Sequence, residues 1–138
     1  MTDATPHPAR AGRAVDIALW VLQALLMLAF VVPVYRKFAG VTESVDLFDE
    51  LGFGQWLRYA VGSLELVLAL CLLAPAIAGL AAAGLVGVMA GAIATEVYVE
   101  SGRWLLPLVL MLLAAMVAVG RRERSGALLR RVRSAPAS

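Results

Sequence analysis

The sequence predicts an all-α integral membrane protein: a transmembrane four-helix bundle with a short interfacial helix between the first and second spans. Of its 138 residues, 62% are hydrophobic and 16% are charged, and the mean hydropathy is +0.85, which lies outside the range of soluble domains. Crossing about 30 Å of hydrocarbon takes roughly 20 apolar residues as a helix, and the chain has length for four such spans. We expect a polar tail over 1–13, a membrane domain over 14–120 and a basic tail over 121–138.

The first predicted span runs from about Ile17 to Val34 and is interrupted only by Gln23. Pro33 fits a helix end or a kink. The preceding polar stretch, 1–13, resembles the n-region of a signal peptide, but no small-residue cleavage site followed by a polar mature start precedes Arg36. Because the run is also long enough to span, we expect an uncleaved helix.

The connection over 35–55 carries acidic residues interleaved with apolar ones at helical spacing. This pattern predicts a short helix lying on the membrane surface, with Thr42 as its N-cap and Gly52 ending it. The acidic positions are Glu43, Asp46, Asp49 and Glu50, and the apolar ones are Val45, Phe48 and Leu51.

The remaining spans are expected at 57–74, 76–95 and 105–120. Pro75 is tolerated in the first turn of a new helix but would break a continuous one, so the second and third spans form a tight hairpin. The fourth is only about 24 Å long at the helical rise, so Trp104 and the arginines after it extend the helix into the headgroup layers.

Small residues recur at every fourth position of the third span, including one GxxxG match. Such a ridge lets another helix approach closely in lipid, so it predicts packing within the bundle or, alternatively, a dimer interface. The ridge consists of Gly79, Ala83, Gly87, Gly91 and Thr95.

Glu65 lies near the middle of the apolar run from Trp56 to Ala74. A carboxylate at the bilayer centre costs at least ~2.5 kcal/mol, so such residues are paired or protonated and face inward. Lys37 and Arg36, at the end of the first span, are the expected partners, because a long basic side chain can reach inward. Two interpretations stay open: a pair that only fixes the bundle, or a site for a ligand or a proton.

A candidate pocket lies at the same end of the predicted bundle. Its residues are Tyr35, Trp56, Tyr59, Glu96 and Tyr98. The aromatic side chains fit an interfacial belt, or the mouth of a pocket for a flat lipophilic molecule such as a quinone. Glu96 and Glu100, one helical turn apart, could share a proton or bind a cation, or pair with nearby arginines.

Several site classes have no counterpart in the sequence. It contains one cysteine, Cys71, and one histidine, His7, so there is no dithiol pair, no metal-ligand spacing and no haem-ligating pair of histidines. We therefore expect no metal, and quinone is the candidate cofactor. The C-terminal arginines need only the positive-inside rule and lack an aromatic stacking platform, so nucleic-acid binding is not expected.

Basic residues predict the orientation. If both termini lie on one side, that side holds eight basic residues (Arg10, Arg13 and six C-terminal arginines), and the other holds four (Arg36, Lys37, Arg58 and Arg103). The positive-inside rule then places both termini in the cytoplasm of a multi-pass protein of the cell membrane.

Five segments resemble the DoxX-like membrane proteins: 35–40 (YRKFAG), 48–54 (FDELGFG), 62–66 (GSLEL), 80–86 (LAAAGLV) and 89–92 (MAGA). The resemblance covers roughly Ile17 to Val119. It implies a four-helix membrane bundle, and some members occur with thiosulfate:quinone oxidoreductase or with a superoxide-detoxifying membrane complex, whereas related eukaryotic proteins assist receptor assembly. Lys37 and Glu65 fall where the family often has basic and acidic residues. The chain departs from the family at Glu96, where a histidine is frequent.

Three functions follow as hypotheses. The first is an accessory or partner-binding subunit of a membrane redox complex, without catalytic activity of its own, whose partner is a membrane protein or a second copy of the chain. The second is a quinone-binding oxidoreductase subunit that uses Glu65 as proton donor and acceptor. The third is a small-solute or proton-coupled transporter, which the lack of a recognisable inverted repeat or discontinuous helix makes the weakest.

Overall fold

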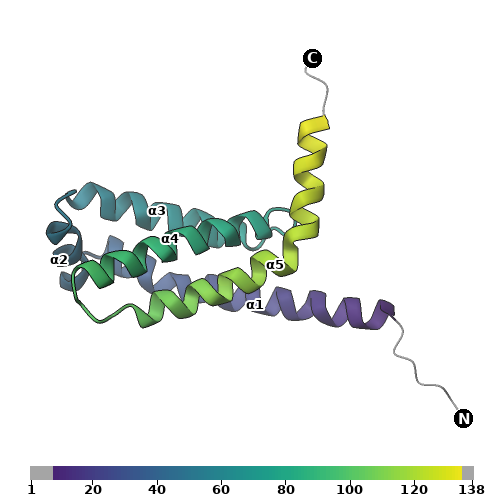
Figure 1. The fold of residues 1–138 in the computed structure, drawn as a ribbon, viewed down its shortest axis with the longest axis horizontal. Coiled ribbons are helices and arrows are strands. Elements are labelled where there is room, and N and C mark those ends of the chain that lie inside the picture. Colours follow the sequence, from purple (N-terminus) through teal and green to yellow (C-terminus); the bar gives the residue numbers. More distant parts are fainter. Residues whose placement is uncertain (1–7, 135–138) are drawn as a thin grey trace, which may run out of the picture.

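The computed structural model describes residues 8–134, and this part of the chain is helical without any β-strand. The helices are α1 (Pro8–Phe38), α2 (Thr42–Glu50), α3 (Gln55–Cys71), α4 (Ala78–Tyr98) and α5 (Leu105–Ser134) (Figure 1). The all-α class predicted from the sequence is confirmed.

The four long helices lie side by side and alternate in direction (Figure 1). α1 packs against α3 and α5, and α4 packs against α3 and α5. The short helix α2 lies across one end of the molecule, which we call the α2 end. The start of α1, the α3–α4 turn and the second half of α5 lie at the opposite end, the terminal end.

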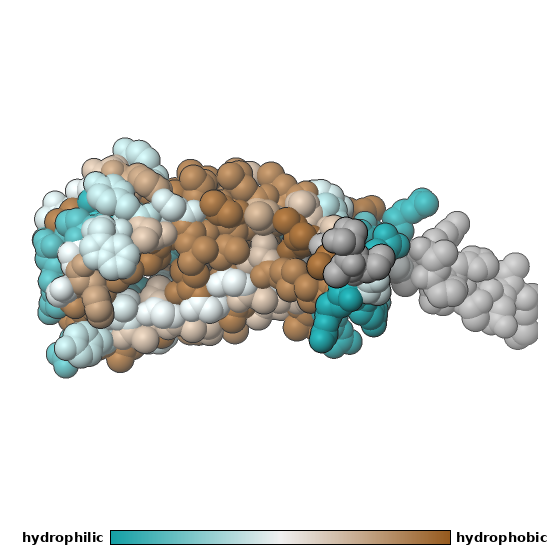
Figure 2. Space-filling view, turned by 90° about the horizontal axis from the view of Figure 1, so that it is seen from above, coloured by the Kyte–Doolittle hydropathy of each residue, from teal (hydrophilic) through white to brown (hydrophobic). Residues whose placement is uncertain are grey.

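Within residues 8–134, three helices are long and apolar enough to cross a membrane: α1 over Gly12–Phe38, α4 and α5. Figure 2 shows a hydrophobic middle between two hydrophilic ends, the pattern of a protein surrounded by lipid. With 17 residues, α3 extends about 25 Å at the helical rise, less than a full hydrocarbon core. Membrane embedding is thus supported, while a crossing by α3 stays a prediction.

Several helix ends differ from the predicted ones. α1 continues through Pro33 to Phe38, since one lost backbone hydrogen bond need not end a helix that is packed along its length. In α2, Val41 rather than Thr42 is the cap residue, and no side chain caps the helix. α5 does not end near Gly120 but runs to Ser134, bending away from the other helices in its second half (Figure 1).

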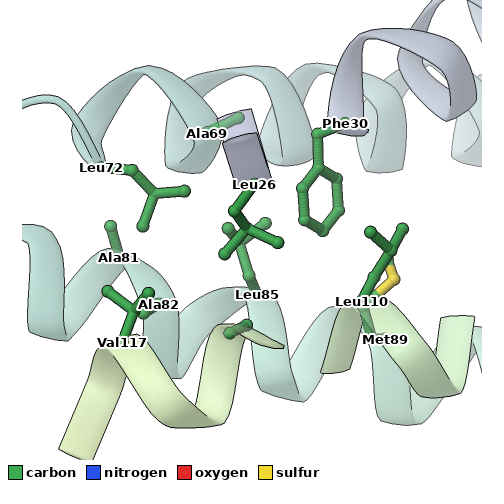
Figure 3. Close-up of a cluster of buried hydrophobic side chains, with 11 residues drawn as sticks. Leu26, Phe30, Ala69, Leu72, Ala81, Ala82, Leu85, Met89, Leu110 and Val117 are labelled. Atoms are coloured by element: carbon green, nitrogen blue, oxygen red, sulfur yellow. The ribbon is translucent and has the colours of Figure 1, made fainter. Parts of the chain in front are cut away.

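The core consists of apolar side chains from the four long helices (Figure 3). Leu26 and Phe30 of α1 and Leu85 of α4 belong to this cluster, and each of the three is fully buried. Small residues in α4 keep the helices close, because Ala81 and Ala82 take positions that longer side chains would fill. The core also includes Ala69, Leu72, Met89, Leu110, Ala114 and Val117.

Candidate ligand pocket and buried ion pair

Glu65 lies on α3 and is fully buried. The Nζ atom of Lys37, in the last turn of α1, donates hydrogen bonds to Oε2 at 2.9 Å and to Oε1 at 3.1 Å of Glu65. The structure therefore brings Glu65 and Lys37 together as a bidentate, charge-assisted pair away from lipid. Arg36 is directed elsewhere: its guanidinium pairs with Glu43 of α2.

Gly62, one turn before Glu65, lets α1 approach α3 at this point. A Cβ atom at position 62 would lie 3.2 Å from a ring carbon of Phe38 and 3.4 Å from Cβ of Lys37. The first distance is tight for carbon atoms, and the second lies at the lower limit of ordinary contact. The absence of a side chain at Gly62 thus sets the distance over which Lys37 reaches Glu65.

Arg58 is a second buried polar residue, and it holds the backbone of Lys37 in place. Arg58 is buried, and its Nη1 atom donates to the backbone oxygen of Lys37, a carbonyl in the last turn of α1 that has no partner within the helix. Arg58 Nε donates to Gln55 Oε1 at 2.6 Å. Gln55 Nε2 donates in turn to α2, at Val45 O (3.1 Å) and Asp49 Oδ1 (2.6 Å).

A pocket of about 740 Å³ opens beside the ion pair, and residues from all five helices line it. Most of the lining is apolar, from Val32 on α1, Val61 and Leu64 on α3, Met89 on α4 and Leu110 on α5. Lys37 and Glu65 lie in this wall. The volume is in the range of small-molecule sites, which are mostly apolar with a few placed polar groups.

Charged residues form the rim of the pocket at the α2 end. Glu43 pairs with Arg36 and also with Arg103, whose Nη1 atom is 2.9 Å from Oε2 of Glu43. All three side chains are at least 39% exposed, so water and salt screen these pairs, which contribute little to stability. They nevertheless join α1, α2 and the α4–α5 loop beside the pocket.

The aromatic residues predicted for the pocket lie elsewhere. Tyr35, Trp56, Tyr59 and Tyr98 are exposed and are not among the residues that line the large pocket. Tyr98 borders a smaller surface hollow with Leu51, Phe53, Ala94 and Thr95. Glu96 does line the large pocket, where its carboxylate accepts a hydrogen bond from Ser101 Oγ.

The small-residue ridge on α4 divides into two parts. A Cβ atom at Gly79 would lie 2.5 Å from Ser125 Oγ and 3.2 Å from Arg121 O, so this glycine packs against α5. Ala83, Gly87 and Gly91 are exposed, and Cβ atoms at the two glycines would meet nothing within 4 Å. Gly91 also lines the large pocket.

A second polar cluster, at the terminal end, was not predicted from the sequence. Arg121 is 1% exposed, and it donates to Asp16 Oδ1 at 2.5 Å and to Gln23 Oε1 at 2.6 Å. Gln23 Nε2 donates to Leu72 O, near the end of α3, at 2.5 Å. The interruption of the first span by Gln23 was the one sequence signal that could have indicated it.

No group of histidine, cysteine, aspartate or glutamate side chains suited to a metal ion occurs in residues 8–134. The sequence model of a family described as the DoxX-like family matches residues 21–117, which contain α2, α3 and α4 in full. No curated protein and no solved structure matches the chain.

Proposed function

This chain belongs to the DoxX-like family, and we propose that it binds a lipophilic carbonyl compound of the quinone class within the membrane, as an accessory subunit of a redox complex. One observation carries this proposal: a mostly apolar pocket with a buried Lys37–Glu65 pair in its wall. An apolar lining suits a ring and its tail, and the ion pair supplies the polar contact that fixes orientation.

The geometry of the pair leaves a donor for such a ligand. A lysine ammonium group has three N–H bonds, and within the described residues Lys37 Nζ donates only to the two oxygens of Glu65. The remaining N–H can donate to a carbonyl oxygen of a ligand in the pocket. Reduction of that carbonyl, with electrons from a partner protein, would draw a proton from the ammonium group, and reoxidation would return one to that nitrogen or to the Glu65 carboxylate beside it.

An accessory role follows from the composition of the chain. One cysteine and one histidine in 138 residues offer no dithiol pair and no haem-ligating pair, so a partner protein would supply the electrons. The exposed Ala83 and Gly87 on α4 support a place for that partner, because small residues let a helix approach closely in lipid.

The structure supports a transport function less well than quinone binding. The apolar core extends from Met89 and Leu110, which line the pocket, to Leu72, whose carbonyl oxygen accepts from Gln23. The eleven core residues between the two polar clusters are hydrophobic. A solute or proton would have to cross this packed region without polar partners, which is costly.

The proposal is tested with a short-chain benzoquinone and the purified protein in nanodiscs. Lys37→Met alone would leave a buried, unpaired carboxylate, which destabilises a fold by roughly 3–5 kcal/mol, so the informative variant is Lys37→Met with Glu65→Gln. We expect this double variant to fold but to bind the quinone at least about tenfold more weakly, the effect of losing a hydrogen bond from a charged group.

The control is Glu100→Gln, an exposed glutamate outside the pocket that makes no ion pair within residues 8–134. It should bind like the unaltered protein. Fluorescence quenching gives the affinity, and thermal unfolding in the same nanodiscs reports folding. Lack of quinone binding by the unaltered protein, or equal binding by the double variant, contradicts the proposal.

A further inference from the structure

The second half of α5, residues 121–134, begins against the bundle and then leaves it. Arg121 and Ser125, one turn apart, are 1% and 4% exposed. Both face the first turn of α4, where Gly79 has no side chain and so leaves room for close packing. From there the helix bends away across the terminal end of the molecule (Figure 1). The hydrogen bonds of Arg121 to Asp16 and Gln23 fix this point of departure.

Arg121 and Ser125 lie on one side of α5, and apolar residues follow on the same side. Leu129 follows Ser125 by four positions and Val132 follows Leu129 by three, the spacing that keeps side chains on one side of a helix. Leu129 is 46% exposed and Val132 is 67% exposed, because the helix has by then passed the edge of the bundle. The side that faced protein at Ser125 is therefore uncovered at Leu129 and Val132.

Arginines flank this apolar strip. At 3.6 residues per turn, Arg122 and Arg133 fall on one side of the strip and Arg131 on the other. All three, and also Arg130, are exposed and make no ion pair within the described residues. Glu123 is the single acidic residue among the six arginines of residues 121–134.

From these observations we infer that residues 121–134 bind anionic lipid headgroups. The bent segment lies along the bilayer surface at the terminal end, with Leu129 and Val132 at the boundary with the acyl chains. Arg122, Arg131 and Arg133 reach the phosphates on either side. The positive-inside rule explains basic residues after a span, but it does not require an apolar strip at helical spacing between them.

The test uses the full chain in nanodiscs, with Cys71→Ser removing the native thiol. A polarity-sensitive fluorophore is attached at Val132→Cys, and the matched control is Ala127→Cys, an exposed position on the opposite face of the helix. In discs that contain phosphatidylglycerol, the probe at position 132 should emit at shorter wavelength and be quenched several-fold less by aqueous iodide than in pure phosphatidylcholine. The probe at 127 should stay accessible in both.

Replacing Arg122, Arg131 and Arg133 by glutamine should abolish the difference between the two lipids. Circular dichroism and thermal unfolding of the same samples establish that the variants are folded. Equal quenching at positions 127 and 132, or equal quenching at 132 in neutral and anionic discs, would overturn the inference. The quinone-binding proposal does not depend on either outcome.

Discussion

At the scale of single residues, the free-energy cost of burying a charge made the need for a partner of Glu65 predictable from the sequence. Glu65 was expected to have a partner because it interrupts an apolar run, and Arg36 and Lys37 were the candidates in the sequence. In the structure Lys37 takes that place, while Arg36 pairs with Glu43, since neighbouring residues point about 100° apart around a helix. Arg58 could not be predicted, because its acceptor is a backbone oxygen that becomes available only where α1 ends beside it.

Two glycines of α4 give the prediction at this scale. Gly87→Leu should leave thermal stability unchanged, because nothing lies within 4 Å of the added Cβ, but it should disrupt a partner or oligomer that uses this face. Gly79→Ala should destabilise the fold by about 1–3 kcal/mol through overpacking, since the new Cβ would lie 2.5 Å from Ser125 Oγ.

Thermal unfolding in detergent measures the stability of both variants. Size-exclusion chromatography and co-purification from membranes measure the oligomeric state and the partners of Gly87→Leu. Unchanged oligomeric state and partners in Gly87→Leu would remove the support that this face lends to an accessory role. A melting temperature of Gly79→Ala equal to that of the unaltered protein would show that α4 and α5 are less closely packed there.

At the scale of helices, the sequence located all five, but not what holds α2 in place. α2 has one buried residue, Phe48, and it lies between Gly40 and Gly52, which have φ angles of 66° and 74°, values that favour glycine. Gln55 binds α2 at Val45 O and Asp49 and joins it through Arg58 to the backbone of Lys37. The position of α2 over the pocket is thereby coupled to the ion pair.

We predict that Gln55→Leu loosens α2. Loss of two hydrogen bonds, each worth about 1 kcal/mol, should speed hydrogen exchange of the amides in residues 43–50 by roughly tenfold or more. Ser44→Ala is the control, because this α2 residue lines the pocket but its hydroxyl makes no hydrogen bond within the described residues. Equal exchange in both variants would show that Gln55 does not retain α2.

At the scale of the whole molecule, the number of crossings decides the topology. An odd number of spans puts the termini on opposite sides of the membrane and an even number on the same side. The described ends of α1 and α5 lie at one end of the molecule (Figure 1), and α3 lies alongside α4 although it is short. Bilayer thinning by a few ångströms costs only fractions of a kcal/mol per ångström, so we expect four crossings.

Reporter fusions test this expectation. Green fluorescent protein fused after Ser138 should fluoresce, and alkaline phosphatase at the same place should be inactive, as for a cytoplasmic C-terminus. The same pair of reporters fused at Gly102, in the α4–α5 loop, should give the reverse result. A C-terminus on the far side would mean that α3 does not cross.

The packed core between the Lys37–Glu65 pair and the Arg121 cluster determines from which end of the molecule a proton can reach Glu65. Under the proposed function, a proton that Glu65 exchanges would come from the α2 end, where charged residues line the pocket, because eleven hydrophobic residues fill the route from the terminal end. Every proton taken up or released would then be drawn from, or returned to, a single compartment. Coupled to electrons arriving from the opposite side, a reaction at this pocket would move charge across the membrane and do electrical work against its potential.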